Sequence, residues 1–283
     1  MTIKCILLPV SGYEPDETGF AAAFGLARAL GAFVEGLHVK PDPREAVPIA
    51  AEGAAGSVIA RMIDLAEKDA AGRAGHAQRL FETAAKKAGV ALGGAKAQAK
   101  FSTVVGRAAD EVTIRARVAD LVILVRVAGD ARIDWNVTVE ATLMEGGRPV
   151  LILPAGLKAW SAATAALGWN GSAEAARAAA AALPILGQAK RVILLAGVKD
   201  VPVEPSLDQL ADWLAHHGVK AETRKVALKG WPVEGQIDDE AQAAGAELLV
   251  MGAYGHSRMR EMVFGGATRA VLDESKIPVL LMH

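Results

Sequence analysis

Cysteine is almost missing from this sequence, with Cys5 the single one in 283 residues. A disulfide within the chain is therefore excluded, as is a zinc site built on several thiolates. Blocks of Lys and Arg are missing too, and the formal net charge is -1 with an isoelectric point of about 6.6. Electrostatic nucleic-acid binders usually carry a basic face or tail, so we expect no nucleic acid as partner.

Long hydrophobic runs are also lacking. The longest segment of low polarity, residues 173–186, is interrupted by Glu174 and Arg177 and is too short to span a bilayer. The opening MTIKCILLPVSG is basic and then apolar, but its apolar part is short and no small-residue cleavage pattern follows. We therefore interpret it as a first buried strand and expect a cytoplasmic protein with no membrane association.

The chain does contain a repeated βαβ pattern. Short runs rich in Val, Ile and Leu alternate with segments of helical period, which predicts parallel strands covered by helices on both faces. In the first half we expect strands at 5–12, 32–40, 94–104, 120–127 and 148–155, and helices at 17–31, 58–89, 108–119 and 138–147. In the second half we expect strands at 165–172, 190–198, 220–230, 246–252 and 277–283, and helices at 173–186, 206–218, 233–245 and 268–275.

The two halves end alike, with RPVLILP at 148–154 and IPVLLMH at 277–283, which indicates duplication of one unit. Pro, Gly and polar residues interrupt the pattern between 154 and 162. We therefore predict an α/β protein with two domains, 1–154 and 162–283, each an open parallel five-stranded sheet with helices on both faces. The two apolar endings could also pair edge to edge, within the chain or between chains, because an uncovered apolar edge invites pairing.

The most distinctive stretch is MGAYGHSRMREMVFGGATR, residues 251–269. Gly252 and Gly255 follow a predicted buried strand, and Gly265 and Gly266 come just before a predicted helix. Glycine lets the main chain approach a phosphate, and a helix start offers free N–H groups and the positive end of the helix dipole. Ligands of parallel sheets bind beyond the carboxyl ends of the strands. A phosphate cradle is the interpretation we favour over a long surface turn in which the glycines only permit positive φ.

The G-x2-G-x9-G spacing in GAYGHSRMREMVFGG resembles the ATP-binding branch of the universal stress protein family, and the halves resemble tandem domains of that family. The resemblance implies that the second domain binds ATP or a related adenine nucleotide. The residues assigned to this site, by the resemblance or by their place beside it, are Trp169, Asn170, Gly197, Val198, Met251, Gly252, Gly255, His256, Arg258, Gly265, Gly266, Ala267 and Thr268.

The chain departs from the family pattern at two places in this domain. The pattern ends in Gly-Ser or Gly-Thr, whereas here Gly266 follows Gly265 and the hydroxyl comes only at Thr268. The family's first turn usually carries an Asp, and here Asn170 stands in its place. An amide keeps hydrogen-bonding ability but loses the negative charge that a hard cation prefers, so Mg²⁺ is a weaker expectation than the nucleotide.

Single side chains near the site have two interpretations each. Arg258 is a permanent cation that could meet phosphate charge, and His256 lies in the same loop, but ordinary loop polarity explains both equally well. Trp169 and Trp231 flank predicted site turns and could stack on a base, although isolated tryptophans are more often packing residues. Thr268 could cap its helix or donate its hydroxyl to a phosphate oxygen.

The first half departs further from the family pattern. It lacks the G-x2-G after its fourth strand, and Asp130, Arg132 and Asp134 would place charge where glycines must stand. Ser11 stands where an acidic residue is expected. We expect no ATP in this domain, which would serve as a structural or partner-binding half. Trp135, in the same stretch, could be exposed at an interface.

Other chemistry has less support. His216 and His217 are adjacent and would point about 100° apart on a helix, away from one metal site. The acidic run 238–240 near a helix start is better interpreted as a complement to the helix dipole than as a metal site. Ser257 could receive a phosphoryl group, but no general base is identifiable beside it.

The leading hypothesis is a nucleotide-dependent regulator of a stress response, which self-associates through its halves or as a dimer and has no catalytic residues. Two alternatives remain. One is a slow ATPase or autophosphorylating enzyme, and the other is an interaction scaffold that works without nucleotide.

Overall fold

The structure is a computed structural model that describes residues 2–12, 16–42, 56–93, 98–127, 132–157, 159–198, 203–228, 233–253, 271–272 and 274–283. Ten strands form one sheet in the order β3-β2-β1-β4-β5-β10-β9-β6-β7-β8. Those of the first half are β1 (Cys5–Pro9), β2 (Phe33–Lys40), β3 (Ala99–Val105), β4 (Leu121–Val125) and β5 (Val150–Leu153). Those of the second half are β6 (Thr164–Gly168), β7 (Arg191–Gly197), β8 (Ala221–Val226), β9 (Leu248–Gly252) and β10 (Val279–Met282).

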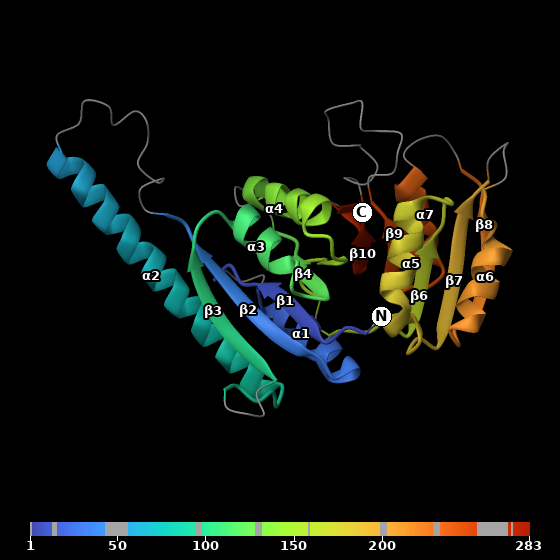
Figure 1. The fold of residues 1–283 in the computed structure, drawn as a ribbon, viewed down its shortest axis with the longest axis horizontal. Coiled ribbons are helices and arrows are strands. Elements are labelled where there is room, and N and C mark those ends of the chain that lie inside the picture. The colour runs from blue at the N-terminus through green and yellow to red at the C-terminus, as the bar shows by residue number, and fades with distance from the viewer. Residues whose placement is uncertain are drawn as a thin grey trace.

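Helices cover both faces of this sheet (Figure 1). One buried cluster joins the sheet to α1 (Asp16–Leu30), α2 (Gly56–Lys87), α5 (Ala173–Leu186) and α6 (Leu207–His216). A second cluster joins the other face to α3 (Ala108–Ala116), α4 (Arg132–Glu145) and α7 (Val233–Ala243). The mixed α/β architecture predicted from the alternating pattern is confirmed.

The apolar strand runs follow from burial on both faces. Along β1, Ile6 and Leu8 belong to one cluster and Leu7 belongs to the other, because successive side chains of a strand point to opposite faces. Each of these side chains is at most 2% exposed. A strand with helices on both sides therefore reads as a continuous apolar run in the sequence.

The two halves of the sheet are joined through β5 and β10. These strands pair antiparallel, with Val279 opposite Ile152 and Leu281 opposite Val150, whereas the other strand pairs that the structure describes are parallel. The apolar endings of the halves thus pair edge to edge within the chain. The two predicted five-stranded sheets are consequently one continuous sheet of ten strands.

Helix α4 begins at Arg132, six residues before the start predicted from the sequence at 138. Trp135, Val139 and Leu143 are buried at four-residue spacing, which places them on one face of a helix. The expectation of an interfacial Trp135 is wrong, because its side chain is only 9% exposed and packs in the core. Arg132 and Asp134 interrupt the apolar residues here, so the helical spacing was not recognised in the sequence.

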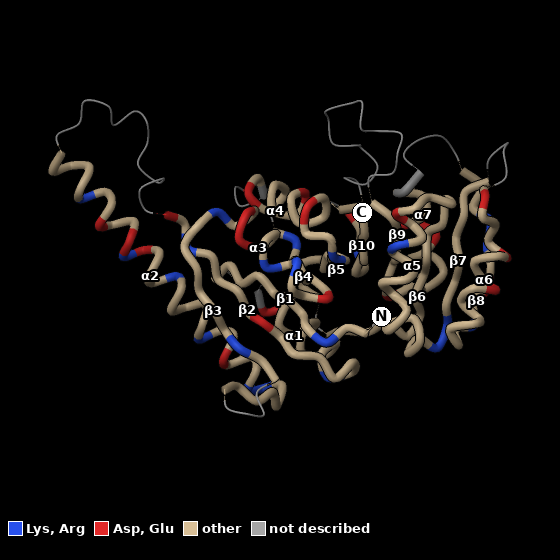
Figure 2. The backbone as a smooth tube through the Cα atoms, in the orientation of Figure 1, with Lys and Arg blue, Asp and Glu red and all other residues tan. Residues whose placement is uncertain are grey.

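Helix α2 is longer than the strands that it covers and extends beyond the sheet (Figure 1). Its buried residues lie in its second part, from Ala70 to Ala85. Acidic and basic residues are mixed along it (Figure 2). Within the described ranges, no helix is both long and apolar enough to cross a membrane.

Candidate functional site

The order of the strands places a switch point between β6 and β9. The chain proceeds from β6 to β7 on one side, and returns through β9 on the other. Leu167 of β6 is in register with Val250 of β9, so the exits of these strands, at Gly168 and Gly252, lie side by side. Crevices at such points, beyond the carboxyl ends of the strands, are where open parallel sheets bind their ligands.

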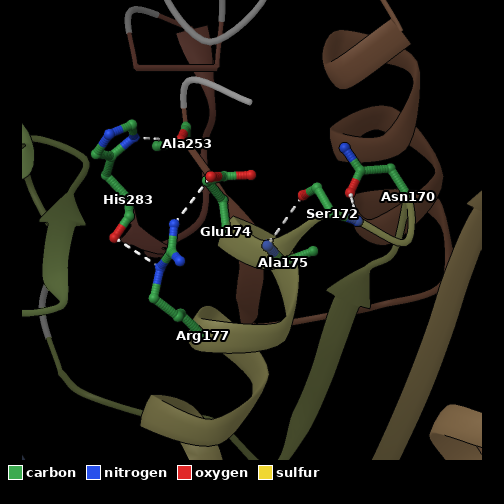
Figure 3. A network of polar contacts seen from close by, with 7 residues as sticks. All are labelled: Asn170, Ser172, Glu174, Ala175, Arg177, Ala253 and His283. Carbon is green, nitrogen blue, oxygen red and sulfur yellow. Dashed lines mark hydrogen bonds and ion pairs between the residues drawn. The ribbon is translucent and has the colours of Figure 1, made fainter. Parts of the chain in front are cut away.

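The loop that leaves β6 folds into a tight turn and opens α5 (Figure 3). The Oδ1 of Asn170 accepts from the N–H of Ser172 at 3.0 Å. Gly171 has φ +75°, and a Cβ there would overlap the carbonyl group of Glu204. Ser172 is the N-cap, and its Oγ accepts from the N–H of Ala175 at 3.1 Å. The GWNGS sequence therefore fits this turn for local reasons of φ and capping.

Trp169 lies inside the core, with 6% of its surface exposed. Its indole Nε1–H donates to the carbonyl of Pro205 at 2.7 Å, and its backbone N–H donates to Leu195 at 2.7 Å. These contacts are those of a packing residue and favour core packing over stacking on a base as the role of Trp169.

The exit of β7 combines a close approach with an exposed side chain. At Gly197, a Cβ would overlap the side chain of Leu228. The next residue, Val198, is 55% exposed, while its N–H donates to the carbonyl of Val226 at 2.8 Å. The backbone at this strand end is therefore hydrogen-bonded to β8, and Val198 presents one apolar side chain at the carboxyl edge.

Gly252 at the exit of β9 packs against the start of α5. A Cβ on Gly252 would lie 2.5 Å from the amide nitrogen of Ala175 and 2.7 Å from the carbonyl carbon of Glu174. Met251 beside it is 5% exposed and belongs to the core. The glycine is therefore required by helix–strand packing, a role that the sequence pattern alone did not reveal.

A polar network lies beside this contact (Figure 3). The buried Glu174 accepts from Nη2 of Arg177 at 2.8 Å, and Nε of Arg177 donates to the carbonyl of His283 at 3.0 Å. Nδ1 of His283 lies 3.1 Å from the carbonyl oxygen of Ala253. Arg177 compensates the carboxylate charge at the start of α5 and ties this helix to the end of β10.

Sequence reasoning did not assign Glu174, Arg177 or His283 to the site region. A signal was present for the first two, because an acid and an arginine three residues apart on a helix can pair. The partner role of His283 depends on the pairing of β9 with β10. The sequence pattern gave no sign of this partner.

Asp238 differs from its sequence-based interpretation. It lies in the second turn of α7 and is 5% exposed, so it does not complement the dipole from a solvated first turn. Burial raises the pKa of its carboxyl. Hydrogen bonds donated by Ser275 Oγ and Gln242 Nε2, both at 2.9 Å, lower this pKa and so partly oppose the effect of burial. Within the described ranges, His, Cys, Asp and Glu side chains form no group of three that could hold a metal.

Part of the predicted site falls outside the described residues. These positions are Gly255, His256, Arg258, Gly265, Gly266, Ala267 and Thr268, and also Ser257, Trp231 and Asp130. The structure thus describes the edges of the candidate crevice: the loop after β6, the end of β7, and the exit of β9.

Comparison with known proteins adds to this geometry. The whole chain is similar in fold to a universal stress protein from Archaeoglobus fulgidus, with a TM-score of 0.70 and 16% identity over 98% of this chain and 97% of that one. A functionally unknown protein from Pseudomonas aeruginosa has a TM-score of 0.55 and 15% identity over 99% and 92%. A universal stress protein solved in complex with cAMP is 22% identical over 42% of this chain and 95% of that one, with a TM-score of 0.33.

Among curated proteins, no sequence matches this chain. At the level of families, residues 164–283 match the model of the Universal stress protein family. This match covers β6 to β10 and includes the glycine stretch from which the resemblance was inferred. Residues 164–283 are therefore similar to the universal stress protein family, and the fold of the whole chain is similar to that of a universal stress protein.

Proposed function

We propose that the second half binds ATP or a closely related adenine nucleotide, with its phosphates on the glycine stretch 252–268, and that binding regulates a stress response in the cytoplasm. One observation carries the proposal. Gly252, the first residue of this stretch, lies at the exit of β9 at the switch point, beside the first turn of α5. Glycine-rich backbone at such a crevice suits a phosphate group.

Asn170 supports direct contact with the nucleotide. Its side chain is exposed, and its Nδ2 has no hydrogen-bond partner among the described residues, while Oδ1 is held by Ser172. An amide N–H donates to a phosphate or ribose oxygen without charge repulsion. A carboxylate in this place would instead favour a bridging cation. The nucleotide is therefore held chiefly by donors of the chain, and Mg²⁺ contributes little.

The strand order also gives room for a nucleotide. β7, β6 and β9 are neighbours in the sheet, and two strand spacings amount to about 10 Å. An adenine against the exposed Val198 at the end of β7 would thus lie across the exit of β6 from the glycine stretch. This arrangement follows the contacts that the family resemblance implies for Gly197 and Val198.

The pairing of Glu174, a carboxylate at the edge of the candidate crevice, favours binding over turnover. Glu174 is buried and paired with Arg177, so it is a poor general base for a water molecule. We expect release of phosphate from ATP by the purified protein to equal that of a Gly255→Val variant. Turnover above this control would favour the enzyme alternative.

The test is calorimetric titration of the full-length protein with ATP, with and without Mg²⁺, beside Gly255→Val. Gly255 is chosen because Gly252 has a packing role of its own. We expect one site per chain that the variant loses. A titration without heat, together with no nucleotide released from the denatured protein, would leave the glycines as a turn and refute the proposal.

A further inference from the structure

Arg126, the residue after β4, extends its side chain from the first half of the sheet to the second. Its Nη1 donates to the carbonyl of Ser275 at 2.8 Å, and its Nη2 lies 3.3 Å from the carbonyl oxygen of Val271. Residues 271, 272 and 274 are helical, so these carbonyls lie at the end of a helix, where the last carbonyls have no N–H partner further along the helix. The carbonyl of Val271 also accepts from the N–H of Ser275 at 3.1 Å. The guanidinium also places positive charge at the negative end of that helix.

Arg126 occupies in the first half the position that Ala253 occupies in the second. The N–H of Arg126 donates to Leu153, the last residue of β5, at 2.9 Å. The N–H of Ala253 donates to Met282, the last residue of β10, also at 2.9 Å. At the point where the second half opens into its glycine stretch, the first half therefore carries an arginine that serves the other half.

The same helix end is held from a second side. The Oγ of Ser275 donates to the buried Asp238 of α7 at 2.9 Å, and Ser275 itself is 1% exposed. Arg126 lies close enough to Asp238 to lower its pKa electrostatically, against the effect of burial. The guanidinium of Arg126 and the carboxylate of Asp238 thus both bond to Ser275. None of these three side chains is exposed.

We propose that Arg126 is a positioning residue through which the first half controls the nucleotide affinity of the second. The inference rests on the proposed function. The sequence predicts that the helix ending at Ser275 begins at Thr268, directly after the glycine stretch. A helix of this length moves as a stiff rod, so a shift of its C-terminal end displaces its N-terminal end as well. On this prediction, Arg126 sets the position of the helix start by holding Val271 and Ser275.

The experiment compares ATP titrations of the full-length wild type, Arg126→Gln, Arg126→Lys and Arg148→Gln, at a temperature where circular dichroism shows each to be folded. Arg148 is the matched control, because its guanidinium also donates to a carbonyl, that of Arg117 at 3.1 Å, but within the first half. We expect Arg126→Gln to weaken binding about ten-fold, within the usual range of coupling between sites. Arg126→Lys should lie between, because an ammonium cannot reproduce the planar fork.

A second readout reports on the contact itself. The N–H of Ser275 donates to Val271 at 3.1 Å, and its hydrogen exchange should be faster in Arg126→Gln than in the wild type. By reciprocity, ATP should slow this exchange in the wild type. A residue that only stabilised the fold would change the unfolding midpoint and leave the affinity of folded protein unchanged.

The outcomes separate the two proposals. If the wild type binds ATP and Arg126→Gln binds it with the same affinity, the inference is overturned and the proposed function stands. A wild type that binds no ATP overturns the proposed function and the inference with it. If Arg126→Gln does not fold, Arg126→Lys decides in its place, and unchanged affinity in that variant overturns the inference.

Discussion

Gly252 and Ala175 approach so closely that a Cβ on the glycine would lie 2.5 Å from the amide nitrogen of the alanine. Two elements meet at this contact, the exit of β9 and the first turn of α5. Neither can withdraw easily, because β9 is paired on both sides and α5 is capped by Ser172. The first glycine of the candidate phosphate cradle is thus also part of the core packing around it.

We predict that Gly252→Ala destabilises the protein by about 1–3 kcal/mol, the usual cost of inserting a methyl group into a packed contact. The clash is with backbone atoms, which cannot rotate away as a side chain can. Urea unfolding followed by circular dichroism measures the change. Gly72→Ala is the control, because a Cβ at this position in α2 would meet no atom within 4 Å apart from the adjacent backbone of its own helix, and alanine there should stabilise by about 0.5–1 kcal/mol. Equal unfolding midpoints for the two variants would contradict the packing role.

Asn170→Asp should make nucleotide binding depend on Mg²⁺. The carboxylate can still accept the hydrogen bond from Ser172, so we expect the turn to keep its shape. Without a cation, its negative charge repels the phosphates and affinity falls several-fold, whereas with Mg²⁺ it gains a ligand role. Calorimetric titration with and without Mg²⁺ checks this. Asn136→Asp, which adds the same charge in α4, should leave both titrations unchanged, and an equal response of the two variants would exclude a local role for Asn170.

Glu247 holds the start of β6 with one carboxylate oxygen. Its Oε2 accepts from Ser161 Oγ at 2.8 Å and from the N–H groups of Ala163 and Thr164 at 2.7 and 3.3 Å. The Ser161 hydrogen bond is the largest cause of its lowered pKa, which the two N–H donors lower further. Because the folded-state pKa lies below the unfolded one, this stabilisation is present above the unfolded pKa and is lost as pH falls through the folded pKa.

Glu247→Gln should therefore cost on the order of 1 kcal/mol at pH 7, because bonds to a charged acceptor are replaced by bonds to a neutral one. The difference from the wild type should vanish in acid, below the pKa values of both states. Urea unfolding of the two proteins at a series of pH values from 7 downwards measures it. A difference that stays constant over that series would show that the charge of Glu247 has no part in the effect.

Asp238 should produce the opposite pH dependence. Burial is the largest cause of its raised pKa, so the folded protein holds this proton to higher pH than the unfolded chain does. Stability due to Asp238 is consequently full below its unfolded pKa and decreases as pH rises through the folded pKa. Asp238→Asn removes the ionisation and keeps an acceptor for Ser275 Oγ. Relative to the wild type, this variant should gain stability as pH rises above the ordinary Asp range, and a loss over the same range would contradict the prediction.

The sequence predicted best those elements whose cause is local. α5 has the predicted bounds, 173–186, because a capping serine precedes an alanine-rich run. α4 was shortened in the prediction because Arg132 and Asp134 looked like loop charges, while the spacing that buries Trp135 and Val139 was overlooked.

Contacts between the halves were beyond local reasoning. Arg126 donates hydrogen bonds to Val271 and Ser275, which lie 145 and 149 positions further along the chain. No spacing in the sequence indicates partners at such a distance. The packing role of Gly252 was hidden for the same reason, since Ala175 comes close only through the pairing of β6 with β9. The glycine spacing of the candidate site could be recognised in the sequence because its residues are near one another in the chain, and the phosphate cradle stays a prediction.

The antiparallel joint between β5 and β10 also has a consequence for folding. Residues 154–278 separate its strands, whereas β1 and β2, or β6 and β7, are joined through a single helix. Closing a longer loop costs more entropy, so each half gains its parallel pairs first and the joint closes late. Until then VLIL and VLLM are open apolar edges, and at high concentration each can add to the matching edge of another folding molecule. Refolding yield should therefore decrease with protein concentration, with strand-exchanged dimers as the by-product.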